Sequence, residues 1–380
     1  MKHKYSSIMA SSLAKVVSVA AIATMTVNII IPDHTQSETE NRPLQTFPSW
    51  NTEHVLSGQY TKDLNTWFSD QFVCRDQNIH IKYLIQKTFG VKEIQDVFLT
   101  KQGLIEKTAK PNKEQLERNL NAINTFKQNN PELNVGFVTV PNAVSIKKEY
   151  LPKYAVTLDQ DKQMDNIYSQ LDDSIIKIDL RNTLKKHKDE YLYYKTDHHW
   201  TSLASYYAYQ DIAKAFNLET TKQSDYTIYP VTTNFEGTLA NKTGSVNIKD
   251  EIDIYVPKDK CDYVITDEST NKKSRTIYHS NALETKDQYT VFMGGNKALF
   301  HINVDNNSKR HLLLIKDSYA NSLIPFLIPQ FNSITVIDAR YYFEDYTRLI
   351  KDDLITDVLF MNNANTFVQD TSLADMLEAN

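Results

Sequence analysis

Four short apolar runs, each bounded by polar or turn residues, constrain the fold of this chain more than any other feature. They are NVGFVTV at 134–140, HLLLI at 311–315, SITVID at 333–338 and DVLFM at 357–361. Each run is apolar on both faces, which is typical of a strand buried inside a mostly parallel sheet. Helical patterns alternate with these strands, among them residues 113–128 and the segment after Thr201. The sequence therefore predicts an α/β fold whose helices cover both faces of the sheet, in three layers.

The small number of glycines excludes two large classes of protein. Only eight of the 380 residues are glycine, and no GxGxxG or P-loop spacing can be assembled from them. No nucleotide cofactor is therefore expected. The net charge of -5 argues against a nucleic-acid partner, which usually meets a basic face. The length allows two domains, or one large domain with an insertion.

The two cysteines, Cys74 and Cys261, form no CxxC motif, which excludes zinc ribbons and thioredoxin chemistry. Two isolated thiols are the favoured interpretation. A single disulfide is the alternative if the body lies outside the cytoplasm, because the sequence does not give the geometry of the pair.

Residues 1–33 have the pattern of a membrane anchor or a secretory signal. A basic start is followed by an uncharged run from Val16 to Ile31, which Pro32 ends. A cleaved signal would use Ala21 and Ala23 as its A-x-A-like site. An uncleaved anchor is favoured, because the apolar run continues eight residues past Ala23. Either alternative places the rest of the chain on the extracytoplasmic side.

The remaining chain is divided by composition. Residues 34–50 are polar with two prolines and are interpreted as a linker, and residues 51–380 as the folded body. Residues 59–90 show helical spacing, and a hairpin is expected around Gly103. Further strands are predicted at 174–180 and 191–195. Alternating Tyr, Thr, Ile and Val with turn signals predict a β-rich insertion at 225–300.

The most unusual string is KTDHHWT at 195–201, placed between a predicted strand and a helix. In an extended loop Asp197 and His199 project to the same side, and His198 faces away. A carboxylate and an imidazole from one loop suit a general base and the group that orients it. The alternative is that these side chains are satisfied polar groups at a helix entry.

A second string, KDSYANSLIPFL at 316–327, follows a predicted buried strand. Ser318 would lie at the carboxyl edge of the sheet, where ligands gather in open α/β folds. A nearby helix N-terminus would favour a developing oxyanion there. The alternative role of Ser318 is an N-cap for that helix. Together the two strings supply Ser, His and Asp, the parts of a nucleophilic triad.

With these motifs the sequence resembles the DHHW protein family, which is related to the alginate O-acetyltransferases and so to SGNH hydrolases. The resemblance runs from about Ser37 to Asn363. Besides D-H-H-W at 197–200 and KDSYANSLIPFL, the matching stretches are SETENRPL near the linker, NFEGTLANKTG at 234–244, VFMGGNKAL at 291–299 and VIDARYY at 336–342.

The resemblance implies a three-layer SGNH-like α/β fold with Ser318 as nucleophile, His199 as base and Asp197 as its partner. The G-D-S block of SGNH hydrolases is K-D-S here, with Lys316 in place of glycine. The SGNH resemblance also implies a Gly and an Asn that complete an oxyanion hole.

Four further residues are candidates for oxyanion or substrate contact. Gly295 and Asn296 are the first pair, since a glycine permits close backbone approach and the amide is a donor. The alternative for this pair is a tight turn in the insertion. Asn142 and Arg340 each follow a predicted strand. No metal site is expected, because the adjacent residues 197–199 seldom converge on one ion and no HxH or HExxH spacing occurs elsewhere.

The resemblance implies O-acetyl transfer to a cell-surface or secreted polysaccharide through an acyl-serine. Carbohydrate ester hydrolysis is the alternative reaction, and a non-catalytic glycan-binding or scaffold protein is the alternative class. A membrane-bound O-acyltransferase is the implied acyl-donor partner. The expected location is the extracytoplasmic face of the cell membrane, or outside the cell if the signal is cleaved.

Overall fold

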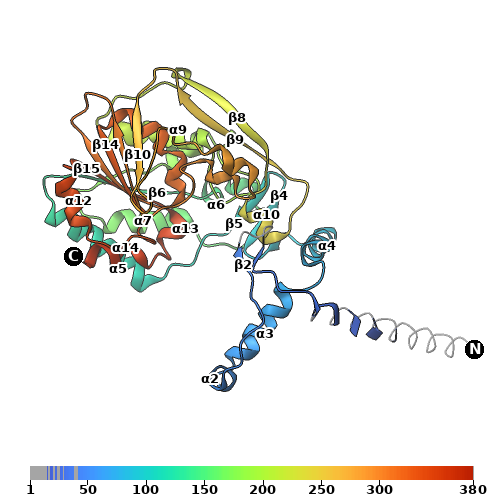
Figure 1. Ribbon diagram of the computed structural model, residues 1–380. Coiled ribbons are helices and arrows are strands. Elements are labelled where there is room, and N and C mark those ends of the chain that lie inside the picture. Colours follow the sequence, from blue (N-terminus) through green and yellow to red (C-terminus); the bar gives the residue numbers. More distant parts are fainter. Residues whose placement is uncertain are drawn as a thin grey trace, which may run out of the picture. The chain divides into compact units, whose positions relative to one another are not determined.

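The computed structural model describes residues 42–379 and 30–37, with positions 15, 18, 19, 22, 23 and 26–28 before them. Much of the predicted anchor at 16–31 lies outside the described residues. Among the residues that are described, no helix combines the length and the apolar character needed to cross a membrane. The chain forms two compact units, whose elements are labelled in Figure 1. The first unit comprises the described residues up to Phe89 together with Gly244–Val246, and the second comprises Gly90–Thr243 and Asn247–Asn380.

The first unit is mainly helical. Residues 59–90, predicted as helical, form two helices separated at 71–74, where Cys74 adopts a left-handed backbone with a φ of 54°. Gly244 belongs to this unit, since its carbonyl oxygen lies 3.0 Å from His80 Nδ1. Its elements are β1 (Gln36–Ser37), β2 (Arg42–Pro43), α2 (Thr52–Leu56), α3 (Gln59–Asp70) and α4 (Arg75–Thr88).

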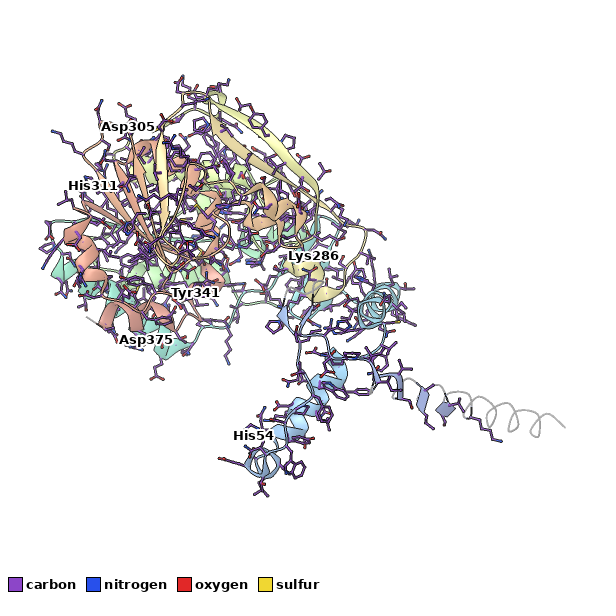
Figure 2. The ribbon with its side chains drawn as sticks, viewed as in Figure 1. His54, Lys286, Asp305, His311, Tyr341 and Asp375 are labelled. Carbon is purple, nitrogen blue, oxygen red and sulfur yellow. The ribbon has the colours of Figure 1, made fainter. Side chains whose placement is uncertain are left out.

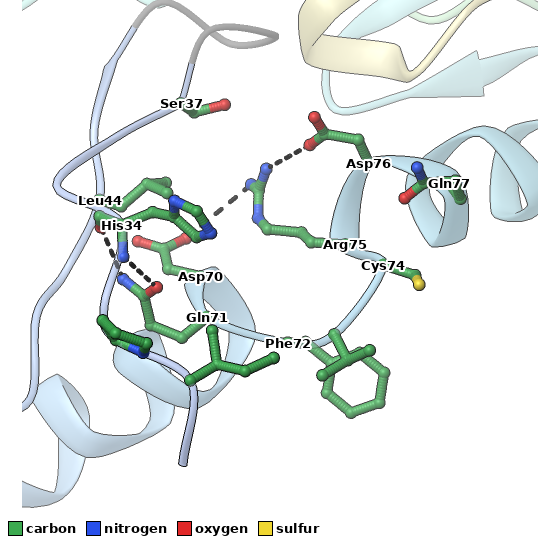
Figure 3. Close-up of a pocket in the computed structure, with 13 residues that line it drawn as sticks. His34, Ser37, Leu44, Asp70, Gln71, Phe72, Cys74, Arg75, Asp76 and Gln77 are labelled. Carbon is green, nitrogen blue, oxygen red and sulfur yellow. Dashed lines mark hydrogen bonds and ion pairs between the residues drawn. The ribbon is translucent and has the colours of Figure 1, made fainter. Parts of the chain in front are cut away.

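A pocket of about 470 Å³ lies in the first unit, between the segment around His34 and the junction of α3 and α4 (Figure 3). Arg75 lies 3.8 Å from Asp70 and 3.3 Å from Asp76, and Gln71 exchanges hydrogen bonds with the backbone of His34. Cys74 lines this pocket, and both cysteines of the chain are free thiols.

The second unit is built on an eight-stranded mixed sheet with the order β11-β10-β12-β14-β13-β15-β6-β7. The α/β prediction is confirmed, and the four apolar runs form the central strands. Five neighbouring strands, from β14 to β7, are parallel, and the other three are antiparallel. The parallel strands are β6 (Asn134–Val140), β7 (Ile176–Lys177), β13 (His311–Lys316), β14 (Ser333–Ile337) and β15 (Asp357–Asn363).

Apolar clusters cover both faces of this sheet because its buried strands alternate their side chains. In β13, Leu312 and Leu314 join the cluster under one set of helices, and Leu313 and Ile315 join the other. The helices α9 and α11 pack on the first face, and α5, α7, α12 and α14 on the second (Figure 1). Their bounds are α5 (Lys113–Asn129), α7 (Gln160–Gln170), α9 (Ser202–Ala215), α11 (Ile324–Leu327), α12 (Tyr346–Asp352) and α14 (Ser372–Glu378).

The segment 225–300 has more than one kind of structure. Its β8 and β9 pair only with each other, but β10 and β11 continue the main sheet beyond β12. Between these strands lie one α-helix and two 3-10 helices. The elements are β8 (Tyr226–Phe235), α10 (Thr238–Thr243), β9 (Asp250–Pro257), β10 (Tyr263–Asp267), β11 (Lys272–Ser274), η3 (Ser280–Glu284), η4 (Gln288–Val291) and β12 (Leu299–Val304).

Other local predictions have mixed outcomes. The hairpin around Gly103 is confirmed, and it carries a short third strand. The predicted strand at 191–195 is wrong, because that segment forms a loop whose only β-pairing among the described residues is a bridge between Tyr193 and Trp200. The remaining elements are β3 (Glu93–Ile94), β4 (Val97–Thr100), β5 (Gly103–Glu106), α6 (Ala143–Ile146), η1 (Lys148–Tyr150), α8 (Arg181–Lys186), η2 (Gln223–Asp225), η5 (Ser318–Ser322), η6 (Ile328–Gln330) and α13 (Ala364–Phe367).

Candidate active site

Ser318 lies where the buried strand β13 ends and the 3-10 helix η5 begins. Asp317, and not Ser318, caps this helix, since its Oδ1 accepts the backbone N–H of Tyr319 at 2.9 Å. The other oxygen of Asp317 accepts the backbone N–H of Asn363, at the end of β15, at 2.7 Å. The capping role considered for Ser318 is therefore filled by its neighbour. The serine hydroxyl is half-buried and free to meet another side chain.

The loop that carries D-H-H-W is held by one buried carboxylate. Asp250, the first residue of β9, accepts the backbone N–H groups of Lys195 and Thr196 at 2.8 and 2.7 Å. It also accepts the hydroxyls of Thr196 and Tyr191. These bonds satisfy backbone groups that the predicted strand would have paired with a neighbour. A side chain of the segment 225–300 thus fixes the approach to Asp197.

Asp197, His199 and Ser318 form a continuous hydrogen-bonded chain. The imidazole Nδ1 of His199 lies 2.6 Å from Asp197 Oδ1, and its Nε2 lies 2.8 Å from Ser318 Oγ. Asp197 Oδ1 also accepts the backbone N–H of His199 at 2.9 Å, which locks the carboxylate to the ring it orients. The structure therefore brings together the three residues predicted as a triad, across a sequence separation of 119 residues. The arrangement has the geometry of a nucleophile, a base and an orienting carboxylate.

The second oxygen of Asp197 is bound by the turn that begins α10. Asp197 Oδ2 accepts the backbone N–H of Thr238 at 2.8 Å and its hydroxyl at 2.9 Å. Gly237 makes this approach possible. A Cβ placed on Gly237 would lie 2.7 Å from Asp197 Cα and even closer to its carboxylate. The stretch NFEGTLANKTG, noted in the sequence, thus contains the residues that hold the triad carboxylate.

Tyr289 completes the packing around the imidazole, and sequence reasoning missed it. Its ring stacks on His199, with centroids 3.8 Å apart and planes at 11°. Its buried hydroxyl donates to the carbonyl oxygen of Ser318 at 3.1 Å and lies 3.3 Å from Ser322 Oγ. Tyr289 lies in η4, within a run that had been interpreted as strand. Nothing in its local pattern distinguishes it from the other 21 tyrosines.

Burial and charge set the ionisation of the two titratable members. Burial, together with the charge on His198, lowers the pKa of His199 to about 4, against the raising effect of Asp197. Burial acts to raise the pKa of Asp197, but the neighbouring His198 and His199 outweigh it and hold that pKa well below its ordinary value. At neutral pH the carboxylate is therefore ionised and the imidazole is neutral. A neutral Nε2 can accept the Ser318 proton.

The acid limb of the pH profile tests this assignment. A base role for His199 requires its neutral form, so the rate at which Ser318 reacts with an activated ester should stay nearly constant from pH 8 down to about pH 5. It should fall about tenfold per unit below about pH 4. The depressed pKa also contributes stability above the ordinary histidine pKa of about 6.5, and this contribution is lost as pH falls through about 4. Steady-state rates and thermal unfolding are to be recorded on the same buffers. A rate that already falls to half its plateau value near pH 6.5 would contradict the prediction.

Asn142, a predicted substrate contact, has its side chain fully engaged within the protein. Its Nδ2 donates to the hydroxyl of Tyr319 at 3.2 Å. Its Oδ1 accepts from Gln160 Nε2 at 2.9 Å and from the backbone of Asn365 at 3.2 Å. Since the hydroxyl of Tyr319 donates to the carbonyl oxygen of His198, Asn142 acts here on the shape of the D-H-H-W loop.

The predicted pair Gly295 and Asn296 lies in a turn after η4. The N–H of Gly295 donates to the carbonyl oxygen of Phe292 at 3.4 Å, and its φ of 94° lies in the left-handed region. Asn296 Oδ1 accepts from Lys316 Nζ at 3.2 Å and from Asn321 Nδ2 at 3.3 Å. These bonds connect the turn to the two ends of the Ser318 segment. An oxyanion role for the pair stays a prediction.

Lys316, which stands where the G-D-S block of SGNH hydrolases has glycine, is buried beside Asp338. Its Nζ lies 3.5 Å from Asp338 Oδ2, and burial lowers its pKa.

Arg340, the other predicted contact residue, forms two hydrogen bonds with the carboxylate of Asp338, at 2.8 and 2.6 Å. The Arg340 side chain stays one-third exposed. It lies beneath the exposed ring of Tyr341, which Figure 2 shows at the end of the sheet opposite His311. Arg340 therefore remains a candidate for contact with an anionic or polar part of a substrate.

The residues of the D-H-H loop could in principle bind a metal ion. Ligand atoms of Asp197, His198 and His199 lie within 4.8 Å of one another. However, both ring nitrogens of His199 are already bonded, one to Asp197 and the other to Ser318. His198 Nδ1 lies 2.6 Å from the hydroxyl of Thr238. A metal at this point would have to replace the triad, so we derive no step through one.

The fold and the site define an α/β protein with a buried Ser-His-Asp constellation at the carboxyl edge of its parallel strands. The family model described as "DHHW protein" matches residues 124–337, more than half of the chain. The chain therefore belongs to the DHHW family, and the resemblance noted in the sequence is confirmed.

Solved structures agree with this assignment. A DHHW family protein from Eubacterium siraeum matches with a TM-score of 0.64 and 26% identity, over 75% of this chain and 94% of its own. Bacillus cereus PatB1 with a sulfonyl adduct matches at a TM-score of 0.61 and 21% identity, over 74% and 97%. A second PatB1 structure gives 0.60 and 22%, over 72% and 98%. No curated protein sequence matches the chain.

Proposed function

We propose that this protein transfers acyl groups, acetyl in the first place, to a cell-surface or secreted polysaccharide through an acyl-serine. The observation that carries the proposal is the bonded chain from Asp197 through His199 to Ser318, with contacts of 2.6 and 2.8 Å. A non-catalytic glycan-binding protein has no need of a neutral, buried imidazole on a half-exposed serine hydroxyl. Structural ion pairs also shift pKa values, but they seldom align a base on a nucleophile.

In the first half-reaction Ser318 Oγ attacks the carbonyl carbon of the acyl donor. His199 Nε2 takes the hydroxyl proton as the new C–O bond forms, and Asp197 stabilises the imidazolium. The backbone N–H of Ser318 makes no hydrogen bond with the described residues, and we assign it to the developing oxyanion. Such a donor lowers the barrier by about 3–4 kcal/mol in related chemistry. Collapse of the tetrahedral intermediate breaks the bond to the leaving oxygen, which takes the proton from His199.

In the second half-reaction a hydroxyl group attacks the acyl-serine. His199 removes the proton of that hydroxyl, and the serine oxygen leaves with it. A sugar hydroxyl gives the transfer product, whereas water gives ester hydrolysis. Transfer is our first proposal because of the relation of the DHHW family to the alginate O-acetyltransferases. Hydrolysis remains the second candidate, because the same triad serves both.

The location and the acyl source follow from the sequence as proposals. The uncharged run from Val16 to Ile31 supports an extracytoplasmic body held at the membrane. Acetyl-CoA is a cytoplasmic donor, so a protein placed there must receive exported acyl groups. A membrane-bound O-acyltransferase is the partner we propose, and confinement to one membrane would raise the effective concentration of the pair. Protease added to intact cells tests the placement, since a cytoplasmic body would be protected.

A covalent adduct on Ser318 tests the proposed chemistry directly. Incubation of residues 34–380 with p-nitrophenyl acetate, quenched in acid, should give a mass increase of one acetyl group on the peptide that contains Ser318. A sulfonyl fluoride should label the same serine irreversibly, because the sulfonyl ester is not turned over. One PatB1 structure carries a sulfonyl adduct, which motivates the choice of probe.

The matched controls separate the serine from background reactivity. Ser318→Ala should show neither adduct, and Ser322→Ala should retain both, since Ser322 is also bonded near Tyr289 but does not contact His199. Acetyl-CoA should give no Ser318-dependent transfer. Labelling that persists in Ser318→Ala would overturn the proposed nucleophile, and efficient use of acetyl-CoA would overturn the proposed partner.

A further inference from the structure

A groove of about 850 Å³ opens beside the triad within the second unit. Its lining comes from six places in the chain: Asp96, residues 106–110 at the end of β5 and after it, the loop at 156–158, His198, α10, and residues 363–369 around α13. None of the residues proposed above for oxyanion or substrate contact lines it. Its volume lies in the range of about 300–1,000 Å³ that is common for ligand sites.

The groove lies next to residues that contact the proposed triad. His198 and Thr238 both line it. Thr238 is the residue whose N–H and hydroxyl hold Asp197, and His198 is adjacent to the base. The ring centroids of His198 and His199 are 3.9 Å apart. A molecule that fills the groove therefore contacts the neighbours of Asp197 and His199, on the side of the D-H-H loop.

Two buried polar atoms on groove-lining residues have no partner among the described residues. They are the hydroxyl of Thr108 and the side-chain N–H₂ of Asn363, and their residues are only 7% and 2% exposed. Buried polar atoms in folded proteins are nearly always hydrogen-bonded, so such atoms need an explanation. A hydroxyl that can donate or accept, together with an amide that can only donate, suits the hydroxyl groups of a sugar.

Three lysines and two carboxylates line the groove, and Glu93, which lies outside the lining, brings these charges into balance. Lys107 pairs with Glu93 at 2.7 Å, and Lys242 with Glu106 at 3.6 Å. Among the lining residues this leaves one acid and one base, Asp96 and Lys110. A polyanionic chain such as a polyuronate would require an excess of cations along its path.

The apolar part of the lining is small and aliphatic. Val156 and Leu158 line the groove and are 78% and 46% exposed, and Leu239 lies on α10. Such groups suit the C–H faces of sugar rings, and no Phe, Tyr or Trp is among the described residues that line the groove. Recognition by hydrogen bonds and aliphatic contact is therefore favoured over stacking.

We infer that this groove binds the acceptor of the transfer reaction, and that the acceptor is an uncharged glycan. Thr108 and Asn363 donate to or accept from its hydroxyl groups, and the hydroxyl to be acylated points past His198 toward Ser318. The identity of the bound glycan as the acceptor rests on the proposed transferase function. Binding of the glycan to the groove does not depend on catalysis and can be measured without it.

Binding is measured first, on the Ser318→Ala protein, so that turnover does not enter. Hydrogen–deuterium exchange is recorded with cellopentaose, with N-acetylchitopentaose and with pentagalacturonate, each at millimolar concentration. The two neutral oligosaccharides should slow exchange in the peptides that cover residues 106–110 and 363–369. Pentagalacturonate should protect them less. No protection with either neutral probe, or stronger protection with pentagalacturonate, would overturn the inference.

Transfer is measured second, with matched variants at one position. Thr108→Val removes the hydroxyl at nearly constant volume, and Thr108→Ser keeps it. Loss of one hydrogen bond should raise the acceptor KM in Thr108→Val by about tenfold, more than it changes hydrolysis of p-nitrophenyl acetate. Thr108→Ser should restore most of the acceptor KM. Lys309→Glu, an exposed change outside the groove, should alter neither rate.

The outcomes separate the groove from the proposed function. Protection without ester turnover by the wild-type protein would leave the groove as a glycan site and reject the transferase. Ester turnover without protection, or with equal acceptor KM in Thr108→Val and wild type, would reject the groove and keep the triad. If Thr108→Val does not fold, the exchange measurement on Ser318→Ala decides alone.

Discussion

Replacement of His199 by alanine is expected to lower kcat/KM for acetyl esters by on the order of 10⁴-fold. The imidazole is the only base in contact with Ser318 Oγ among the described residues, at 2.8 Å, and its low pKa keeps it unprotonated at neutral pH. Without it the serine hydroxyl, with its high intrinsic pKa, has no acceptor for its proton. Stopped-flow release of p-nitrophenol, with thermal unfolding as a check on folding, measures the effect.

The adjacent His198 provides the matched control. It is one-third exposed and bonds to Thr238, and it does not contact the serine. His198→Ala should therefore lower kcat/KM by about tenfold or less, through the loss of one hydrogen bond to the turn that holds Asp197. The double variant His199→Ala/Ser318→Ala should be no slower than either single variant, because the two groups act as a unit. Additive losses would contradict a shared proton transfer.

Gly237→Ala is expected to lower kcat/KM by about 10³-fold or more, although Gly237 touches no substrate. An added Cβ would lie 2.7 Å from Asp197 Cα and overlap the carboxylate, so the loop must shift. The shift would break the bonds from Thr238 to Asp197 and release the orientation of His199. The largest decrease in kcat/KM expected is about 10⁴-fold, the effect of replacing the carboxylate of a catalytic triad by an amide.

Gly136→Ala is the control for a steric clash of an added Cβ at a position away from the candidate site. Like Gly237, Gly136 has an ordinary φ, and a Cβ there would lie 2.5 Å from the ring of Phe216. It lies near the start of β6, far along the strand from the carboxyl edge. This change should lower the free energy of unfolding by about 1–3 kcal/mol with kcat/KM nearly unchanged. Equal kinetic losses in the two variants would show that Gly237 acts through general stability.

The central sheet and the triad could be predicted from the sequence because both leave local signals. Strands buried on both faces are continuous apolar runs, and residues 311–315 and 357–361 needed no tertiary information to be identified. Asp197 and His199 are two residues apart, a spacing that places both side chains on the same side of an extended backbone. Parallel topology then places the end of β13 at the edge where such loops gather.

The supports of the site could not be predicted in the same way. Asp250 and Tyr289 act across 54 and 29 residues, through contacts that depend on how the segment 225–300 folds. A buried aspartate at the start of a strand and a tyrosine among 22 have no distinctive pattern. The error at 191–195 has a related cause. Aromatic residues suit a strand, but the backbone N–H of Tyr194 donates to His199 and that of Lys195 to Asp250, so neither pairs with a neighbouring strand.

Asp197 and His199 lie on a loop that other side chains hold in place. The D-H-H-W and K-D-S motifs alone are therefore not sufficient to identify, in a genome, a chain whose triad is aligned. A descendant that lost Gly237 or Asp250 would keep both signatures and the sheet beneath them, and yet fail to align its imidazole. To identify family members with an aligned triad from sequence, the residues at positions 237, 238 and 250 must therefore be examined together with the triad.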